Sequence, residues 1–286
     1  MGGIRLPDSP GKSQEATYRE PRRAPADAVN GVLTRLICVV LSLSPEHRAR
    51  LLARGLSAAE IERNRYVSAP ATHAERESAA VALAPYLDAF GGGTPGFYND
   101  RGLWRMVYCA PGFLIPARDE WGRIQALALR ADEPLSGKYL WLSSNPEVED
   151  DHCQRKYPLG ASSGAPVHFA NRPGLWGAGE LTVTEGTLKA DVIAALSGLP
   201  VVGVAGVNNT RGLAARLHRN FPQLRRVNVA FDKDVFEKPH VADALYHLLA
   251  QLKAERFTVR VRIWPGESKG LDDYLLSEIS AREVTA

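Results

Sequence analysis

The most regular pattern of hydrophobic and polar positions lies in the last third of the chain. In the segment 241–254, apolar residues stand at positions 241, 245, 248, 249 and 252, which is the 3.6-residue period of a helix with one buried face. Short apolar runs alternate with helical segments, and the pattern predicts strands at 181–184, 200–206, 226–231 and 257–264, with helices at 187–196, 210–220, 241–254 and 271–279. Strands that alternate with helices predict an α/β fold, a parallel sheet flanked by helices.

The preceding part of the chain has a different pattern. Ser44 followed by Pro45, with Gly55 at the end, predicts a capped helix. Ser57 and Glu60 have the spacing of a capping box, which starts a second helix. A longer helix at 74–90, a β-hairpin within 112–132, a strand at 138–144 and a long loop-like tract at 144–166 follow. This mixture predicts an α+β domain before the α/β domain.

The predicted organisation has three parts. Residues 1–28 are rich in Pro, Gly and Arg and lack periodicity, so we expect a disordered or loose arm. The α+β N-terminal domain then spans 29–177, and the α/β domain spans 178–286. The length of 286 residues and the 45% of hydrophobic residues suit one large domain or two ordinary ones.

Charge is distributed unevenly along the chain. The formal net charge is only +3, but residues 1–65 hold 11 Lys and Arg against 7 Asp and Glu, an excess of 11 − 7 = 4. Arginine suits bidentate contact with phosphate. The helices at 44–64 and the residue that follows them carry five arginines that form either a nucleic-acid-binding surface or a solvated helix surface: Arg48, Arg50, Arg54, Arg63 and Arg65.

The cysteines and the apolar runs point to a cytoplasmic protein. Cys38, Cys109 and Cys153 are far apart and form no CxxC pair, which argues against a zinc ribbon and against a disulfide framework. The apolar run at 36–43 is far too short to span a bilayer, so no membrane association is expected.

Acidic residues follow three of the predicted strands. Glu185 follows the strand 181–184, and Asp232 and Asp234 follow the strand 226–231 in the stretch "VAFDKD". After the strand 257–264 the segment "ESKGLDD" contains Glu267, Lys269, Asp272 and Asp273. The carboxyl ends of parallel strands meet at one edge of a sheet, where ligands bind in open α/β folds. An extended "DKD" would also point both of its aspartates to one side.

Gathered carboxylates repel one another unless a cation lies between them. Mg²⁺ prefers carboxylate and water oxygens, and a pair of such ions can clamp the two oxygens of a phosphoryl transfer. Lys189 or Lys269 would then hold a phosphate or offset charge, and Glu185 would serve as a ligand or as a general acid/base. The alternative is that each acidic cluster is a solvated loop, with Asp272 capping the last helix and Asp234 turning the chain.

These motifs resemble the Toprim domain of bacterial-type primases, topoisomerases, small nucleases and recombination mediators. "LTVTEGTLKAD" is similar to its glutamate motif and "VAFDKD" to its DxD motif. Together with "GVAGVNN", "KGLDDYL", "HRARLLARGLS", "PGFLIPARDEWGRI" and "KYLWLSS", they resemble an uncharacterised Toprim-like, primase-like family of phage, plasmid and integrative-element proteins. The likeness covers roughly residues 45–280.

The resemblance implies roles for individual residues. It makes Glu185 the general acid/base, and Asp232 and Asp234 the ligands of Mg²⁺ or Mn²⁺. Four further residues match only the narrower family. Two are lysines expected to be catalytic and two are aspartates expected to bind metal: Lys189, Lys269, Asp272 and Asp273. The chain departs from bacterial-type primases because it carries no zinc ribbon. It also contains no GxxxxGK[ST] motif, so a helicase would be a separately encoded partner.

Three functions remain open from the sequence. The first is a primase-like nucleotidyl transferase that acts on single-stranded DNA with nucleoside triphosphates in the replication of a mobile element. The second is a metal-dependent Toprim nuclease. The third is a non-catalytic DNA-binding accessory protein, whose arginine-rich helices and aromatic residues Trp104, Trp121 and Trp141 would form a strand-binding groove. The alternative for these three tryptophans is a place in the core. A topoisomerase is the least favoured function, because its tyrosine nucleophile requires large clamp domains.

Overall fold

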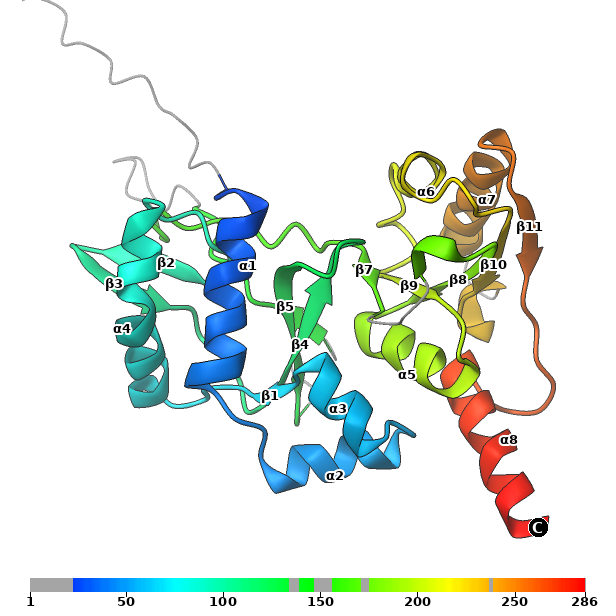
Figure 1. The fold of residues 1–286 in the computed structure, drawn as a ribbon, viewed down its shortest axis with the longest axis horizontal. Coiled ribbons are helices and arrows are strands. Elements are labelled where there is room, and N and C mark those ends of the chain that lie inside the picture. Colours follow the sequence, from blue (N-terminus) through cyan, green and yellow to red (C-terminus); the bar gives the residue numbers. More distant parts are fainter. Residues whose placement is uncertain (1–22, 134–138, 147–155, 171–174, 237–238, 286) are drawn as a thin grey trace, which may run out of the picture.

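The computed structural model describes residues 23–133, 139–146, 156–170, 175–236 and 239–285. Two sheets and their helices make up most of these residues, and they lie side by side along the long axis of the molecule (Figure 1). The first sheet has four antiparallel strands in the order β1-β4-β5-β6, and the second has five strands in the order β11-β10-β8-β9-β7. A separate hairpin is formed by β2 (Phe97–Asp100) and β3 (Leu103–Met106).

The first sheet is built around the predicted hairpin. Its strands are β1 (Val67–Ser68), β4 (Gly112–Arg118), β5 (Ile124–Ala131) and β6 (Tyr139–Trp141). Every residue of β4 is buried, because helices cover the sheet. These helices are α1 (Ala26–Arg35), α2 (Pro45–Ala53), α3 (Ala58–Asn64) and α4 (His73–Ala89). The hairpin is therefore confirmed, and the strand predicted at 138–144 is observed as β6 at Tyr139–Trp141, with residue 138 outside the described residues.

Local sequence signals start the helices as expected. The Ser44 hydroxyl accepts a hydrogen bond from the backbone N–H of His47, and Pro45 occupies the first helical position of α2. Ser57 and Glu60 form the predicted capping box of α3, in which each side chain accepts a hydrogen bond from the backbone N–H of the other residue. Gly55 follows α2 with a φ of 88°, a conformation that glycine adopts without strain.

Helix α1 corrects the expected arm. It begins at Ala26, inside the segment 1–28, and continues through a π-helical turn at Leu36–Val40. Val29, Val32 and Leu33 are buried against the first sheet. No single helix among the described residues is long and apolar enough to cross a membrane. α1 with its extension and α2 pass that test only as a pair, bent by 111°.

The second sheet confirms the predicted α/β fold. Its strands are β7 (His168–Phe169), β8 (Glu180–Glu185), β9 (Val201–Val204), β10 (Arg226–Ala230) and β11 (Thr258–Val261). All neighbours are parallel except β7, which pairs antiparallel with β9. The helices are α5 (Thr187–Ser197), α6 (Leu213–Asn220), α7 (Pro239–Ala254) and α8 (Leu271–Thr285). Helices α5 and α8 lie on one face, and α6 and α7 on the other (Figure 1).

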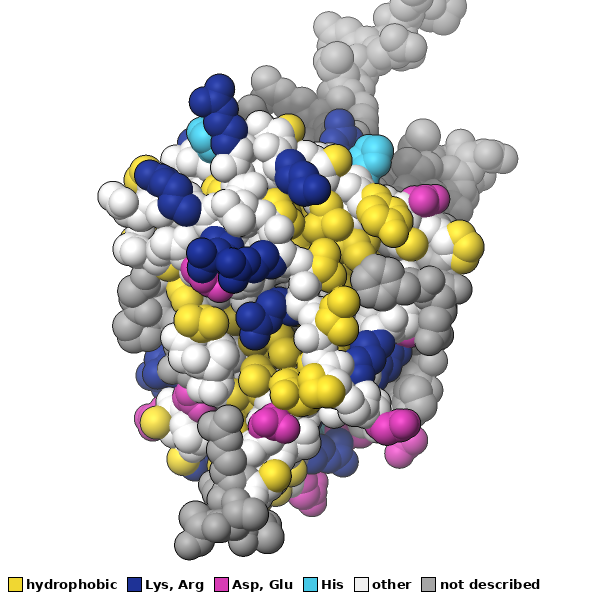
Figure 2. All heavy atoms as spheres, turned by 90° about the vertical axis from the view of Figure 1, so that its right-hand side faces the viewer, with side chains coloured by type: hydrophobic (Ala, Val, Ile, Leu, Met, Phe, Trp, Pro, Cys, Tyr) yellow, Lys and Arg dark blue, Asp and Glu magenta, His cyan; other side chains and the backbone are white. Residues whose placement is uncertain are grey.

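The outer strand of this sheet is exposed but charged. Figure 2 turns toward the viewer the side that carries β11, α7 and α8, and shows Lys and Arg side chains interspersed with apolar ones. Arg260 lies on β11 and Arg262 directly follows it, and both are exposed. Charged side chains on an edge strand discourage its pairing with another chain.

A buried polar network joins the two sheets. The Tyr66 hydroxyl donates to Asp191 Oδ2 at 2.7 Å, and His168 Nε2 lies 3.1 Å from Asp191 Oδ1. The backbone N–H of Arg118 donates to His168 Nδ1 at 3.0 Å, and the Arg118 guanidinium donates to the backbone carbonyl of Asn64. Asp191 belongs to α5 and the other residues come from α3, β4, β7 and the segment before β1. The network therefore fixes α5 against the first sheet.

Candidate active site at the carboxyl edge of the parallel sheet

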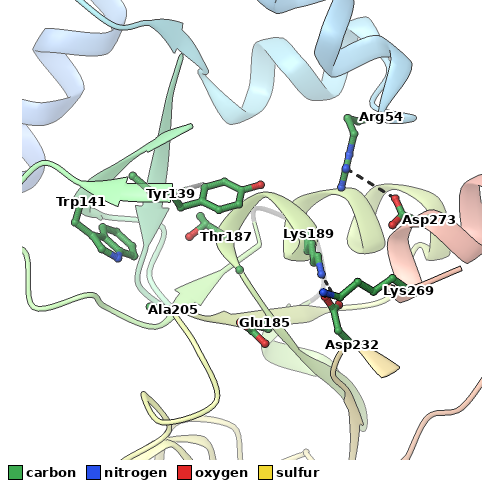
Figure 3. Close-up of a pocket in the computed structure, with 12 residues that line it drawn as sticks. Arg54, Tyr139, Trp141, Glu185, Thr187, Lys189, Ala205, Asp232, Lys269 and Asp273 are labelled. Atoms are coloured by element: carbon green, nitrogen blue, oxygen red, sulfur yellow. Dashed lines mark hydrogen bonds and ion pairs between the residues drawn. The ribbon is translucent and has the colours of Figure 1, made fainter. Parts of the chain in front are cut away.

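Glu185 and the two aspartates of "DKD" lie at the same edge of the second sheet. Thr184 of β8 pairs with Ala230 of β10, so the two parallel strands end side by side. Glu185 is the last residue of β8, and Asp232 follows β10 by two residues. Figure 3 shows their carboxylates on the same side of the sheet. The structure thus brings together residues that are more than forty positions apart in the sequence.

The stretch "DKD" does not stay extended. Residues Lys233–Phe236 form a 3₁₀ turn, so Asp234 lies in the first turn of that element. The expectation that an extended backbone points both aspartates to one side is therefore wrong. The two carboxylates are brought together instead by Lys269, whose Nζ lies 2.9 Å from Asp234 Oδ2 and 3.8 Å from Asp232 Oδ2. The hydrogen bond to Asp234 is the main cause that raises the pKa of Lys269.

A sharp turn between β8 and α5 places Lys189 beside the aspartates. Gly186 has a φ of 93°, which lets the chain leave the strand and enter the helix directly. A Cβ on Gly203 would lie 2.7 Å from the carbonyl oxygen of Gly186, so β9 can approach this turn only with glycine there. Lys189 follows in the first turn of α5, and its Nζ forms an ion pair with Asp232 Oδ1.

Burial gives Glu185 the electrostatics of an acid/base group. Desolvation raises the pKa of the Glu185 carboxyl, and the negative charge of Asp232 raises it further, while Lys189 opposes the shift. A carboxyl whose pKa moves toward neutrality exchanges a proton more readily near physiological pH. The geometry is compatible with the predicted acid/base role and also with metal ligation.

Asp272 and Asp273 form a second acidic layer with Arg54. The Arg54 guanidinium forms an ion pair with Asp272 Oδ2 and lies 3.8 Å from Asp273 Oδ1. Asp272 is buried, and desolvation raises the pKa of its carboxyl in spite of Arg54. A Cβ on Gly270 would clash with Asp272 Oδ1 and would lie 3.3 Å from Asp232 Oδ1. The second layer therefore touches the first.

These side chains open onto a cavity between the two sheets. The cavity has a volume of about 320 Å³ and is lined by Glu185, Lys189, Asp232, Lys269, Asp273 and Arg54 on its charged side. Tyr139 and Trp141 of β6 form its aromatic side, with Ala128, Gly186, Thr187 and Ala205 (Figure 3). Glu267, the remaining acidic residue of the segment before α8, is exposed and is not among the residues that line the cavity.

The five predicted nucleic-acid-binding arginines do not share one environment. Arg54 points into the cavity, Arg50 forms an ion pair with Asp132, and Arg63 lies 3.6 Å from Glu60. Arg48 and Arg65 are exposed. Arg54 was expected on a DNA-binding surface, and sequence reasoning missed its contact with the acidic layer 218 residues away.

The three tryptophans also lie in different environments. Trp104 is buried and its indole N–H donates to Asp88 at 2.7 Å, so the core alternative is correct for it. Trp121 is 58% exposed, at the turn between β4 and β5, and lies 6.2 Å from Trp176 between ring centroids. Trp141 is half-buried and lines the cavity. Its place two residues after Tyr139 on a strand is the signal that both rings face the same side.

The donor set suits a hard divalent cation. Glu185, Asp232 and Asp234 offer carboxylate oxygens, the ligands that Mg²⁺ and Mn²⁺ prefer. Within the described ranges, no three Asp, Glu, His or Cys side chains form a ready ligand cluster. Lysine ammonium groups lie against the two aspartates, so an ion that enters must displace or share their contacts.

The comparisons with known proteins give the fold. A family model described as a domain of unknown function (DUF3854) matches residues 179–281. No curated protein matches. Among solved structures, the zinc-binding and RNA polymerase domains of Aquifex aeolicus primase superpose with a TM-score of 0.65 at 18% identity. The match covers 91% of this chain and 60% of that one, so the chain spans about three fifths of that structure.

Two further solved structures are similar over almost the whole chain. The RNA polymerase domain of Mycobacterium tuberculosis primase DnaG, in complex with a DNA oligomer that has a 6-nucleotide overhang, has a TM-score of 0.59 at 15% identity, with 91% and 81% of the two chains covered. A DnaG primase catalytic domain bound to single-stranded DNA has a TM-score of 0.57 at 20% identity, with 91% and 79% covered. The chain therefore has the Toprim-type fold of primase catalytic cores.

Proposed function

We propose that this protein is a primase-like nucleotidyl transferase that uses Mg²⁺ or Mn²⁺ to join nucleotides on a single-stranded DNA template. One observation carries the proposal: Glu185, Asp232 and Asp234 lie at the same edge of the parallel sheet, beside a cavity with an aromatic wall that Glu185 and Asp232 line. The fold supports it, because similar solved structures include primase domains in complex with DNA. The resemblance in the sequence extends the proposal to replication of a mobile element, with the helicase on another chain.

The charged side chains of the site suit different roles in nucleotidyl transfer. A divalent ion held by Glu185, Asp232 and Asp234 would supply a Lewis acid for the reacting phosphate. Lys269 is 61% exposed at the mouth of the site and is free to contact a triphosphate when it leaves the aspartates. In the absence of a bound ion, burial raises the pKa of Glu185, so the alternative role of this carboxylate is that of a general base for the proton of a 3′-hydroxyl group, with the ion held by Asp232 and Asp234.

The aromatic wall offers a place for a nucleobase. Tyr139 and Trp141 face the charged side of the cavity across its width (Figure 3). The Arg130 guanidinium lies 5.2 Å from the centroid of the Tyr139 ring and fixes that ring from the neighbouring strand. Stacking on an aromatic side chain is tolerant of base identity, which suits an enzyme that copies a template.

A priming assay on single-stranded DNA with labelled nucleoside triphosphates tests the proposal. We expect nucleotide- and metal-dependent products from the wild type. Asp232→Asn and Glu185→Gln should each lower the rate by about 100-fold or more, since each removes a charge that acts on the reacting phosphate. Glu267→Gln removes an exposed carboxylate close by and should leave the rate unchanged.

Two outcomes would contradict the proposal. One is an Asp232→Asn variant that primes as well as the wild type. The other is shortening of labelled DNA with metal and without nucleotides, which would assign the same carboxylates to a nuclease. DNA binding without any reaction in the wild type would support the accessory-protein alternative.

A further inference from the structure

The net charge of the side chains around the cavity matches the binding of one divalent ion. Five carboxylates line or flank it, and three cations lie among them: Glu185, Asp232, Asp234, Asp272 and Asp273, with Arg54, Lys189 and Lys269. With all of them ionised, the net charge of this set is 3 − 5 = −2, or 2 − 5 = −3 once Lys269 has moved away, so a single divalent ion brings the charge close to zero. A second ion would bring the site to a net positive charge before any substrate binds.

The two lysines are held differently. The Lys189 side chain is 20% exposed and starts from the first turn of α5, a helix fixed to the first sheet through Asp191 two residues later. The Lys269 side chain is 61% exposed and starts from the loop before α8. Lys269 can therefore swing into solvent at little cost, whereas Lys189 cannot leave without exposing the buried end of its ion pair.

The burial of Asp272 close to Lys189 indicates that the Lys189 ammonium lies in an enclosed, charged pocket. Asp272 is 1% exposed, and its Oδ1 has no hydrogen-bond partner in the described part of the chain. A Cβ on Gly270 would meet this oxygen, Asp232 Oδ1 at 3.3 Å and Lys189 Nζ at 3.4 Å, so the three atoms surround one point. A buried carboxylate oxygen without a partner is costly unless a positive charge lies nearby. Arg54, which pairs with the other carboxylate oxygen, and the Lys189 ammonium supply this positive charge, and both lower the pKa of the Asp272 carboxyl against the rise caused by burial.

We propose that Lys189 is a built-in cation that replaces a second metal ion, so that the site takes a single divalent ion held by Glu185, Asp232 and Asp234. Lys269 leaves the two aspartates when this ion binds. Lys189 remains between Asp232 and Asp272 and keeps a second ion from binding there. This inference rests on the proposed metal dependence, and it assigns to Lys189 a function different from direct contact with a phosphate.

Titration of the full chain with Mn²⁺, without nucleotide, tests this inference. The free ion is followed by its electron paramagnetic resonance signal, and the heat of binding by calorimetry. We expect one ion per wild-type chain. Lys189→Met, which removes the ammonium and keeps the length of the side chain, should bind a second ion. Lys189→Arg, which keeps the charge, should bind one.

Lys233→Met is the matched control. Lys233 stands between the two aspartates in the sequence, but its ammonium donates to the backbone carbonyl of Gly266 and lies 5.8 Å from the Trp264 ring centroid. Its loss changes the net charge of the chain by the same amount as Lys189→Met, and the stoichiometry should stay at one. A second ion in both methionine variants would mean that overall charge, not position, sets the number of ions, and would overturn the role of Lys189.

The wild-type stoichiometry is decisive even if Lys189→Met fails to fold. Two ions bound to the wild type with similar affinity overturn the inference and leave the proposed nucleotidyl transfer intact. One ion in a folded Lys189→Met variant also overturns it. If the wild type binds no ion, both the inference and the proposed metal dependence are wrong. If it binds one ion but does not prime, the inference stands and the proposed function is wrong.

Discussion

Removal of the Asp191 carboxylate tests how firmly the two sheets are joined. In Asp191→Ala, the Tyr66 hydroxyl and His168 Nε2 lose their acceptor in a fully buried environment. The Arg118 guanidinium, whose pKa is lowered by burial and supported by the charge of Asp191, loses its compensating charge. His168 cannot compensate by a change of tautomer, because its Nδ1 already accepts the backbone N–H of Arg118.

The expected magnitude follows from these orphaned groups. A buried donor without a partner costs about 1–3 kcal/mol, and Asp191→Ala leaves two such donors, the Tyr66 hydroxyl and His168 Nε2, beside the buried Arg118 guanidinium. Because the costs overlap at one carboxylate, we expect Asp191→Ala to lower the free energy of unfolding by about 3–5 kcal/mol. Tyr66→Phe removes only one hydroxyl and should cost about 1–3 kcal/mol.

Urea denaturation followed by circular dichroism measures both changes. Asp243→Ala is the control, since Asp243 is exposed on α7 and its loss should change stability by no more than about 0.5 kcal/mol. If Asp191→Ala unfolds within about 1 kcal/mol of the wild type, the network does not join the sheets, and the claim that it fixes α5 and Lys189 is refuted.

Three more predictions concern the cavity and the cores. Trp141→Ala should raise the KM for nucleotide about 10-fold with little change in kcat, since stacking contributes about 1–3 kcal/mol per base. Trp141→Phe should bring the KM close to that of the wild type. Equal KM values for Trp141→Ala and the wild type would exclude a base at this wall. Burial raises the pKa of the Cys109 thiol from 9.0 to about 12, so its contribution to stability is complete below pH 9 and falls as the pH rises toward 12. Cys109→Ala should flatten a plot of unfolding free energy between pH 8 and pH 10, and an unchanged slope would contradict the raised pKa. Gly270→Ala should weaken Mn²⁺ binding, because the added Cβ meets Asp272 Oδ1, whereas Gly31→Ala meets nothing within 4 Å and should leave it unchanged; equal affinities would show that the acidic layer tolerates displacement.

Periodicity and capping signals correctly predicted those helices whose pattern lies within a single stretch of sequence. The apolar positions along 241–254 and the capping box of Ser57 and Glu60 concern residues three or four positions apart, and the structure has the corresponding helices. Strand β7 has only two residues and pairs with β9 more than thirty positions later, so no local pattern marks it. Helix α1 was missed because the Pro- and Arg-rich residues before it obscured its start.

The site was predictable to the extent that it follows from topology. Parallel strands place Glu185 and Asp232 at one edge, and the alternation of strands and helices already implied that edge. Other features of the site depend on contacts between distant elements: the 3₁₀ turn of "DKD", the contact of Arg54 with Asp272, and the ion pair of Lys189 with Asp232. Such contacts have no signature in the spacing of residues.

The central claim is that one divalent ion binds where Glu185, Asp232 and Asp234 meet. Anomalous diffraction from crystals of the protein soaked in Mn²⁺ tests this most directly. We predict a single strong anomalous peak within coordination distance of these three carboxylates, with Lys269 moved away and Lys189 still on Asp232. A soaked crystal with no peak at this edge of the sheet, or with the ion bound elsewhere, would contradict the account.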